Sequence, residues 1–310
     1  MYQKGTEINA KKAHRKEKRI RFSLYRPLLS VICAFLICIT LADAAHARQI
    51  YDTGQAYKAE RTSERPVSIF VNGQRYTGKA FLSKSTTYVG LREFSMYMGA
   101  DSVTWLSDTK TAQVSANNLS LIAKAGALYI SANGRYLWAG SGVMIKSGTM
   151  YVPLRTVAKA FGGTVSWNSS QFAAYVTKGE AIEPGSAFYD NTDLYWLSRI
   201  IHAEAGGESL LGKVAVGTVV LNRKSSPEFP NTVHGVIFDT KNGVQFTPTA
   251  NGAINCIPSE ESIIAAKLCL DGASISDKAL FFINEALAQS SWVSDNRPFI
   301  VAVGNHNFYA

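Results

Sequence analysis

Residues 193–208 read DLYWLSRIIHAEAGGE, and this stretch is the most informative part of the 310-residue chain. Its apolar residues recur at three- and four-residue spacing, which predicts a helix with one apolar face. Glu204 falls on that face, whereas Arg199 and His202 fall on the opposite side. A carboxyl group in an apolar stripe keeps its proton near neutral pH, because desolvation raises its pKa. Glu204 is therefore a candidate general acid, of the kind that glycosidases use.

Two structural alternatives compete with catalysis for Glu204. It could cap the end of the helix, or it could pair with a buried Arg. Gly206 and Gly207 favour a site, because they are expected to end the helix with a glycine in the left-handed conformation. Glycines also leave the backbone beside Glu204 bare, so that a large ligand could approach closely.

The first 47 residues have the features of an export signal. Nine Lys and Arg precede an apolar run at residues 28–41, and Ala45-His46-Ala47 then forms a cleavage site. The run of 14 residues suits a signal peptide and is short for a membrane span. An uncleaved membrane anchor at residues 28–41 is the alternative. Residues 48–65 are polar and are predicted to be a tether.

The overall charge of +9 comes mostly from this leading segment. Nine of the 32 basic residues and three of the 23 acidic residues lie within residues 1–47, so the remainder has a net charge of +3. This charge does not indicate nucleic acid binding, although it suits the anionic polymers of a cell wall. Cys256 and Cys269 are the only cysteines after residue 47, and two free thiols are favoured over one disulfide.

Residues 66–178 contain an internal duplication. Four motifs return after 61 to 63 residues: YVGLR at 88–92 and YVPLR at 151–155, VTW at 103–105 and VSW at 165–167, MGA at 98–100 and FGG at 161–163, and Asn-Gly at 72–73 and 133–134. Each unit is predicted to contain a type I′ hairpin at Asn-Gly, a short helix after Leu-Arg, and a strand pair that begins at the Trp motif.

This duplicated region resembles the stalk-like repeat named for the N-terminal domain of copper amine oxidases, which is common in exported proteins of Gram-positive bacteria. Residues 66–178 contain no His and no Cys, so copper would lack its usual ligands, and we predict no metal site. The exposed residues form no clear basic or aromatic stripe. A spacer or a wall-contacting module is the favoured role.

A linker is predicted at residues 179–190, followed by a second domain at residues 191–310. Helices are expected over residues 210–223 and from Ser259, as N-cap, to about Leu270. Residues 279–284 and 299–303 are expected to be strands. The predicted fold class is α+β, with duplicated small β-rich units followed by a mostly helical domain.

The second domain carries six motifs in order: AEAGGE (203–208), GKVAV (212–216), VVLNR (219–223), FPNTV (229–233), QFT (245–247) and GNHNFY (304–309). With these motifs, nearly all of residues 191–310 resembles the spore-cortex-lytic enzymes and related cell wall hydrolases of the SleB/CwlJ type. The resemblance implies a lysozyme-like architecture and an exported protein of the cell wall or spore envelope. Its acid/base Glu maps onto Glu204, and the implied partner is peptidoglycan.

The implied reaction is lytic transglycosylation of the bond between N-acetylmuramic acid and N-acetylglucosamine, with Glu204 as acid and then base. It needs no cofactor. Glu208 either tunes the pKa of Glu204 or fixes the following loop. Gln245 could bind an N-acetyl group while Phe246 lies under a sugar ring, or both could anchor their loop. His306 has either a substrate contact or a structural role.

Two rival functions come from other classes. A zinc amidase would cut between muramic acid and the stem peptide, and it needs metal ligands. The candidates after residue 47 are His202, His234 and His306, but the chain has neither H-E-x-x-H nor the P-C-x-x-C of zinc deaminases. The other rival is a non-catalytic wall-binding protein, which binds glycan without cleaving it.

Overall fold

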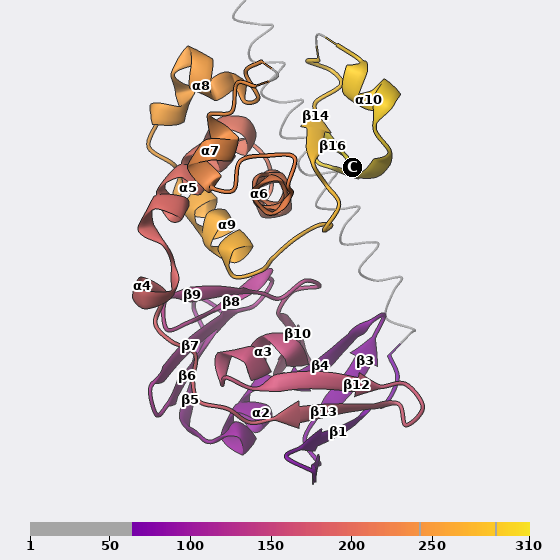
Figure 1. Ribbon diagram of the computed structural model, residues 1–310. Helices are drawn as coiled ribbons and strands as arrows, with labels where there is room; N and C mark the ends of the chain where they lie inside the picture. The colour runs from indigo at the N-terminus through magenta and orange to yellow at the C-terminus, as the bar shows by residue number, and fades with distance from the viewer. Residues whose placement is uncertain (1–63, 242, 289) are drawn as a thin grey trace, which may run out of the picture. The chain divides into compact units, whose positions relative to one another are not determined.

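The computed structural model describes residues 64–241, 243–288 and 290–310 (Figure 1). The expected export segment and almost all of the expected tether lie outside the described residues. Within the described ranges, no helix has the length and apolar character needed to span a membrane. After residue 64, strands predominate over residues 66–178 and helices over residues 191–310, which are called here the N-terminal region and the C-terminal region. The fold class is therefore α+β, as predicted.

The N-terminal region alternates hairpins with two short helices. Its helices are α2 (Leu91–Met98) and α3 (Leu154–Ala160). Its strands are β1 (Ser68–Val71), β2 (Gln74–Tyr76), β3 (Ala80–Ser83), β4 (Thr86–Gly90), β5 (Ala100–Leu106), β6 (Thr111–Ala116), β7 (Leu119–Lys124), β8 (Tyr129–Ala132), β9 (Arg135–Trp138), β10 (Met144–Lys146), β11 (Thr149–Pro153), β12 (Thr164–Asn168) and β13 (Ala173–Thr177).

The predicted repeat elements are present in both units. Asn72 and Gly73 have φ angles of 48° and 79°, and Asn133 and Gly134 have φ angles of 51° and 76°. Positive φ at both central residues defines the type I′ turn, so the two hairpin predictions are confirmed. Helices α2 and α3 begin at the Leu of each Leu-Arg pair, and the two Trp motifs lie in β5 and β12.

A local two-fold axis relates the two units. In the sheet β10-β11-β4-β3, Val89 of β4 lies opposite Val152 of β11, its equivalent in the other unit. On either side, Tyr88 lies opposite Pro153 and Gly90 lies opposite Tyr151, as a two-fold axis through the valine pair requires. The sheet β12-β13-β1-β2 also joins strands of both units, and one hydrophobic cluster runs from Ile69 to Val176. The duplication thus builds one interlocked body.

The C-terminal region is a helical cluster with a small antiparallel sheet, β14-β16-β15. Its elements are α4 (Gly185–Phe188), just before it, then α5 (Asn191–Ala205), α6 (Leu210–Ser225), α7 (Val233–Ile237), α8 (Thr247–Asn251), the 3₁₀ turn η2 (Ala253–Asn255), α9 (Glu260–Leu270), β14 (Phe281–Ile283), α10 (Trp292–Asn296), β15 (Phe299–Val303) and β16 (His306–Tyr309). The predicted helices and strands are confirmed, and the Ser259 side chain caps α9 by accepting from the Ser262 amide. The expected cysteine state is also confirmed, because Cys256 and Cys269 are free.

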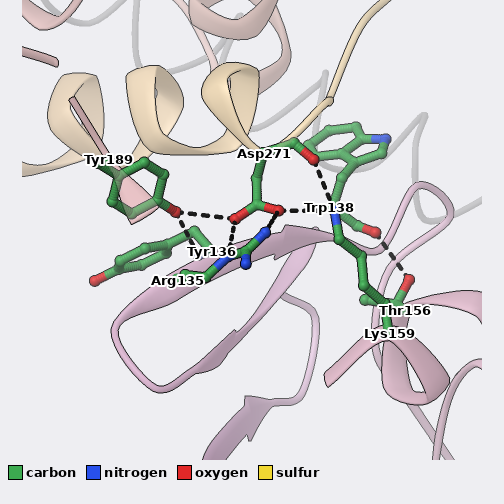
Figure 2. A network of polar contacts seen from close by, with 7 residues as sticks. All are labelled: Arg135, Tyr136, Trp138, Thr156, Lys159, Tyr189 and Asp271. Atoms are coloured by element: carbon green, nitrogen blue, oxygen red, sulfur yellow. Dashed lines mark hydrogen bonds and ion pairs between the residues drawn. The ribbon is translucent and has the colours of Figure 1, made fainter. Parts of the chain in front are cut away.

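The two regions meet at Asp271, which follows helix α9 (Figure 2). Its carboxylate accepts two hydrogen bonds from Arg135, at 2.9 and 2.8 Å, and others from Lys159 at 2.7 Å and Tyr189 at 3.1 Å. Burial alone would raise the pKa of Asp271, but the hydrogen bonds from Arg135 and Lys159 outweigh burial and hold the pKa below its ordinary value. The side chain of Trp138 also packs against the C-terminal core. The N-terminal region is therefore docked directly on the C-terminal region.

Candidate active site

A cavity of about 640 Å³ opens in the C-terminal region, where the end of α5 meets the small sheet. Its walls come from the end of α5, the last turns of α6, the segment before α8, β14, and the turn between β15 and β16. All five residues that the sequence singles out line this cavity: Glu204, Glu208, Gln245, Phe246 and His306. The fold thus brings together groups that lie up to about a hundred positions apart in the chain.

Helix α5 places Glu204 at the edge of the hydrophobic core. Asp190 caps its start by accepting a hydrogen bond from the Asp193 amide at 2.8 Å. The predicted apolar face is buried, and Ile200, one turn before Glu204, has no exposed surface. His202 lies on another side of the helix, where Nδ1 is 3.4 Å from the Ser259 amide nitrogen. The sequence pattern therefore placed both side chains correctly.

Glu204 is half-buried, and burial raises its pKa to about 7. None of the ion pairs among the described residues includes Glu204. A structural pairing with Arg, the second alternative for this residue, is thus absent from the described part of the chain. A carboxyl group with this pKa holds a substantial proton population near neutral pH and can donate that proton inside the cavity.

The helix end differs from its predicted form. Gly206 has φ −55° and ψ −35°, which is right-handed, and Gly207 is not among the glycines with positive φ. The expected left-handed glycine was therefore wrong, because α5 closes without the reversal that a left-handed residue produces. Gly207 nevertheless lines the cavity, and a Cβ atom added there would have no heavy atom within 4 Å. The bare backbone beside Glu204 is present.

Glu208 and the β15–β16 turn form a polar cluster on one wall. Oε1 of Glu208 accepts a hydrogen bond from Asn305 Nδ2 at 2.8 Å and lies 3.8 Å from His306 Nδ1. The longer distance exceeds a hydrogen bond, and His306 Nδ1 is buried without a hydrogen-bond partner. Burial lowers the pKa of His306, although the charge of Glu208 opposes this shift. Glu208 thus ties the end of α5 to a turn far along the chain.

Another wall is organised around Arg223, near the end of α6. Its Nε donates to the Leu280 carbonyl at 2.7 Å, and Nη1 lies 3.4 Å from Oε1 of Gln245. The guanidinium also lies over the ring of Phe246, at 5.3 Å from its centroid. Burial lowers the pKa of Arg223 to about 10. Phe246 is only 2% exposed, which favours the loop-anchor alternative over a ring presented to sugar.

Sequence reasoning underrated two of these residues. Arg223 ends the VVLNR motif and was not among the candidate site residues, yet it lines the cavity and touches Gln245. Asn305 lies beside His306 in the GNHNFY motif, so its position in the sequence was a usable signal. Phe282, Asn284 and Leu287 complete the wall from β14 and the segment after it, and no motif marked them.

Residues 207–309 match the protein family described as Cell Wall Hydrolase. This part of the chain belongs to the cell wall hydrolase family. Its match begins at Gly207 and contains four of the five predicted site residues, whereas Glu204 lies three positions before it. Residues 70–176 match a second family, the copper amine oxidase N-terminal domain. Both family resemblances seen in the sequence are therefore confirmed.

Among curated proteins, the cell wall hydrolase part is similar to spore cortex-lytic enzymes. The one from Bacillus subtilis (strain 168) is 38% identical over 120 residues, which is 39% of this chain and 38% of that protein. The one from Bacillus cereus is 35% identical over 147 residues, which is 47% of this chain and 52% of that protein. The chain thus spans about two fifths to one half of these relatives.

Among solved structures, this chain is similar to the catalytic domain of the germination-specific lytic transglycosylase SleB from Bacillus anthracis. It is 35% identical, with a TM-score of 0.37, and the match covers 42% of this chain and 100% of that chain.

Proposed function

We propose that this chain is an exported peptidoglycan-cleaving enzyme that acts as a lytic transglycosylase on spore cortex or cell wall. The observation that carries the proposal is Glu204, a carboxyl group with a pKa raised to about 7 by burial, at the wall of a cavity of about 640 Å³. The relatives are named spore cortex-lytic enzymes, which supports peptidoglycan as the substrate and favours cortex over vegetative wall.

The proposed reaction uses one carboxyl group twice. Protonated Glu204 donates its proton to the glycosidic oxygen between N-acetylmuramic acid and N-acetylglucosamine, and the bond from C1 of muramic acid to that oxygen breaks. The resulting carboxylate accepts the proton of the 6-hydroxyl of the same muramic acid. Oxygen O6 then bonds to C1, which gives a 1,6-anhydro ring and a free 4-hydroxyl on the other sugar. Glu204 ends protonated, and no water is consumed.

The other cavity residues have supporting roles in this proposal. Arg223 and the buried Phe246 hold the loop that presents Gln245, whose amide can hydrogen-bond an N-acetyl group. Glu208 is engaged with Asn305, which suits it to fixing the wall rather than to activating water. His306, buried beside Phe282 with ring centroids 5.5 Å apart, supports the same wall.

The test is mass spectrometry of the products that the full chain releases from purified cortex and, separately, from vegetative peptidoglycan. Muropeptides with anhydro-muramic ends, lighter by one water than hydrolysis products, are expected. Reducing ends instead would mean hydrolysis, with Glu208 as the first candidate for activating water. Free stem peptides would support the amidase alternative, and the absence of any product would support the non-catalytic wall-binding protein.

Glu204→Gln and Glu208→Gln are the matched pair for this experiment. Each replaces one cavity carboxylate by a neutral amide of nearly the same shape. The Glu204 variant is expected to release no product, whereas the Glu208 variant is expected to retain anhydro products at a lower rate. Near-normal release by the Glu204 variant would contradict the mechanism.

A further inference from the structure

The duplicated N-terminal region contains the same pocket twice. The first pocket, of about 400 Å³, is lined by Arg92 and Trp105 together with Gly148 and Thr149 of the other unit. The second pocket, of about 630 Å³, is lined by Arg155 and Trp167 together with Ser85 and Thr86. Each residue of the first set corresponds to one of the second at the repeat spacing of 62 or 63 residues.

The local two-fold axis explains why both pockets exist. Each pocket takes a Trp from the β5 or β12 strand of one unit and an Arg from the first turn of the helix that precedes that strand, α2 or α3. The opposing wall is a hairpin of the other unit, β10–β11 for the first pocket and β3–β4 for the second. Two-fold symmetry therefore copies a complete pocket, with walls from both units.

The Trp side chains are unusually accessible for their size. Trp105 is 41% exposed and Trp167 is 37% exposed. Trp167 is held edge-on against Phe172, with ring centroids 5.2 Å apart. Two large aromatic rings kept at the surface, at equivalent positions of a duplicated fold, indicate a binding role rather than a packing one.

The polar groups beside the rings are mainly basic. The first pocket contains Arg92 and also Lys79, which hydrogen-bonds Thr149 at 3.0 Å and pairs with the one acid, Glu93, at 3.9 Å. The second contains Arg65, Lys84 and Arg155 and no acid among its lining residues. The Arg155 guanidinium donates to the carbonyl of Val165, two residues before Trp167 in the same strand, which fixes the cation in the second pocket. A pocket that contains both an accessible aromatic ring and a cation suits a sugar ring that carries a carboxylate.

We propose that the two pockets are glycan-binding subsites, each taking a sugar unit of peptidoglycan with the carboxylates of its stem peptide. The Trp ring stacks on the apolar face of the sugar, the Arg pairs with a carboxylate, and the threonine side chain at the hairpin meets a hydroxyl or amide. A polymer that repeats one chemical unit is the natural ligand for a site that occurs twice. This inference rests on the proposed function, since it assumes the same polymer.

The test measures binding without cleavage. Full-length chain with Glu204→Gln is mixed with purified sacculi, and the bound fraction is measured by sedimentation. Trp105→Ala and Trp167→Ala are each expected to raise the sacculus concentration needed for half-saturation by about tenfold. The double variant is expected to raise it further, because two linked sites bind the polymer together. Leu106→Ala, which removes a side chain 38% exposed on the same strand as Trp105, is the matched control and should bind like the parent.

Sacculi whose carboxylates have been converted to amides distinguish the two halves of each pocket. Arg92→Ala and Arg155→Ala are expected to weaken binding to untreated sacculi and to leave binding to amidated sacculi unchanged, whereas the Trp variants are expected to weaken binding to both. Unchanged binding by the double Trp variant, with an unchanged melting temperature, would overturn the proposal, as would a parent that does not bind sacculi. Occupation of the pockets by a protein or a second copy of the chain would produce that unchanged binding.

The same variants in the chain with Glu204 intact separate this inference from the proposed function. Trp-dependent binding without any cleavage products would refute the enzyme and leave the subsites standing. Anhydro products together with Trp-independent binding would refute the subsites and leave the enzyme standing.

Discussion

Replacing Glu204 by Gln is expected to stabilise the protein at alkaline pH and not at acid pH. Burial raises the pKa of this carboxyl group from 4.5 to about 7, so the folded protein binds the proton more tightly than the unfolded chain does. The stability that this proton contributes is fully present below pH 4.5 and is lost as the pH rises through 7. A Gln side chain is neutral at every pH and has no such loss.

The size of the effect follows from the shift. A difference of about 2.5 pKa units corresponds to about 3 kcal/mol, and access of water through the cavity reduces this to about 1–3 kcal/mol. We therefore expect the free energy of unfolding of Glu204→Gln, relative to the parent, to increase by that amount between pH 4.5 and pH 8.

Urea unfolding at the two pH values measures this difference, with Glu228→Gln as the control because Glu228 is exposed on the surface. The control should show no change in relative stability with pH. If the difference in unfolding free energy between Glu204→Gln and the parent is the same at pH 4.5 and pH 8, the argument that burial keeps this group protonated is refuted.

Three further predictions follow from the contacts. Cleavage by the parent should fall about tenfold per pH unit above pH 7, as Glu204 loses the proton it must donate, and a pH–rate profile that rises there would contradict the assignment. Asp271→Asn should cost about 3 kcal/mol of unfolding free energy, because it leaves the buried Arg135 without its charged partner, whereas exposed Asp277→Asn should cost nothing measurable by the same urea titration. Gly304→Ala should lower the melting temperature and the cleavage rate, because φ is 58° and the new Cβ would lie 2.0 Å from Oε2 of Glu208. Gly99→Ala, at a φ of 104° with no atom within 4 Å of the new Cβ, is the control that measures the cost of backbone strain alone.

The sequence predicted most of the helices because their signals are local. The spacing of apolar residues in α5, the Ser259 cap of α9 and the Asn-Gly turns each depend on a few neighbouring residues, and all of them formed. The short helices α7, α8 and α10 were missed, since five residues give too few repeats of a periodic pattern.

The features that could not be predicted depend on residues distant in the chain. The contact of Glu208 with Asn305 joins residues 97 positions apart, and the Arg135–Asp271 ion pair joins residues 136 positions apart. No pattern within a window of the sequence contains such pairs. No aromatic stripe in the N-terminal region is visible in the sequence, because Trp105 and Trp167 lie in pockets that only the two-fold arrangement creates.

The valine pair at the local two-fold axis also bears on ancestry. A free-standing copy of one unit would display β4 as an open edge, and a second copy could cover it through the same Val–Val register that Val89 and Val152 make in this chain. That association is a symmetric homodimer with two identical pockets. Fusion of the two copies removes the need for assembly at high concentration, and it lets each pocket mutate independently. The second has already diverged, since Trp138 and Phe172 border it without aromatic counterparts in the first.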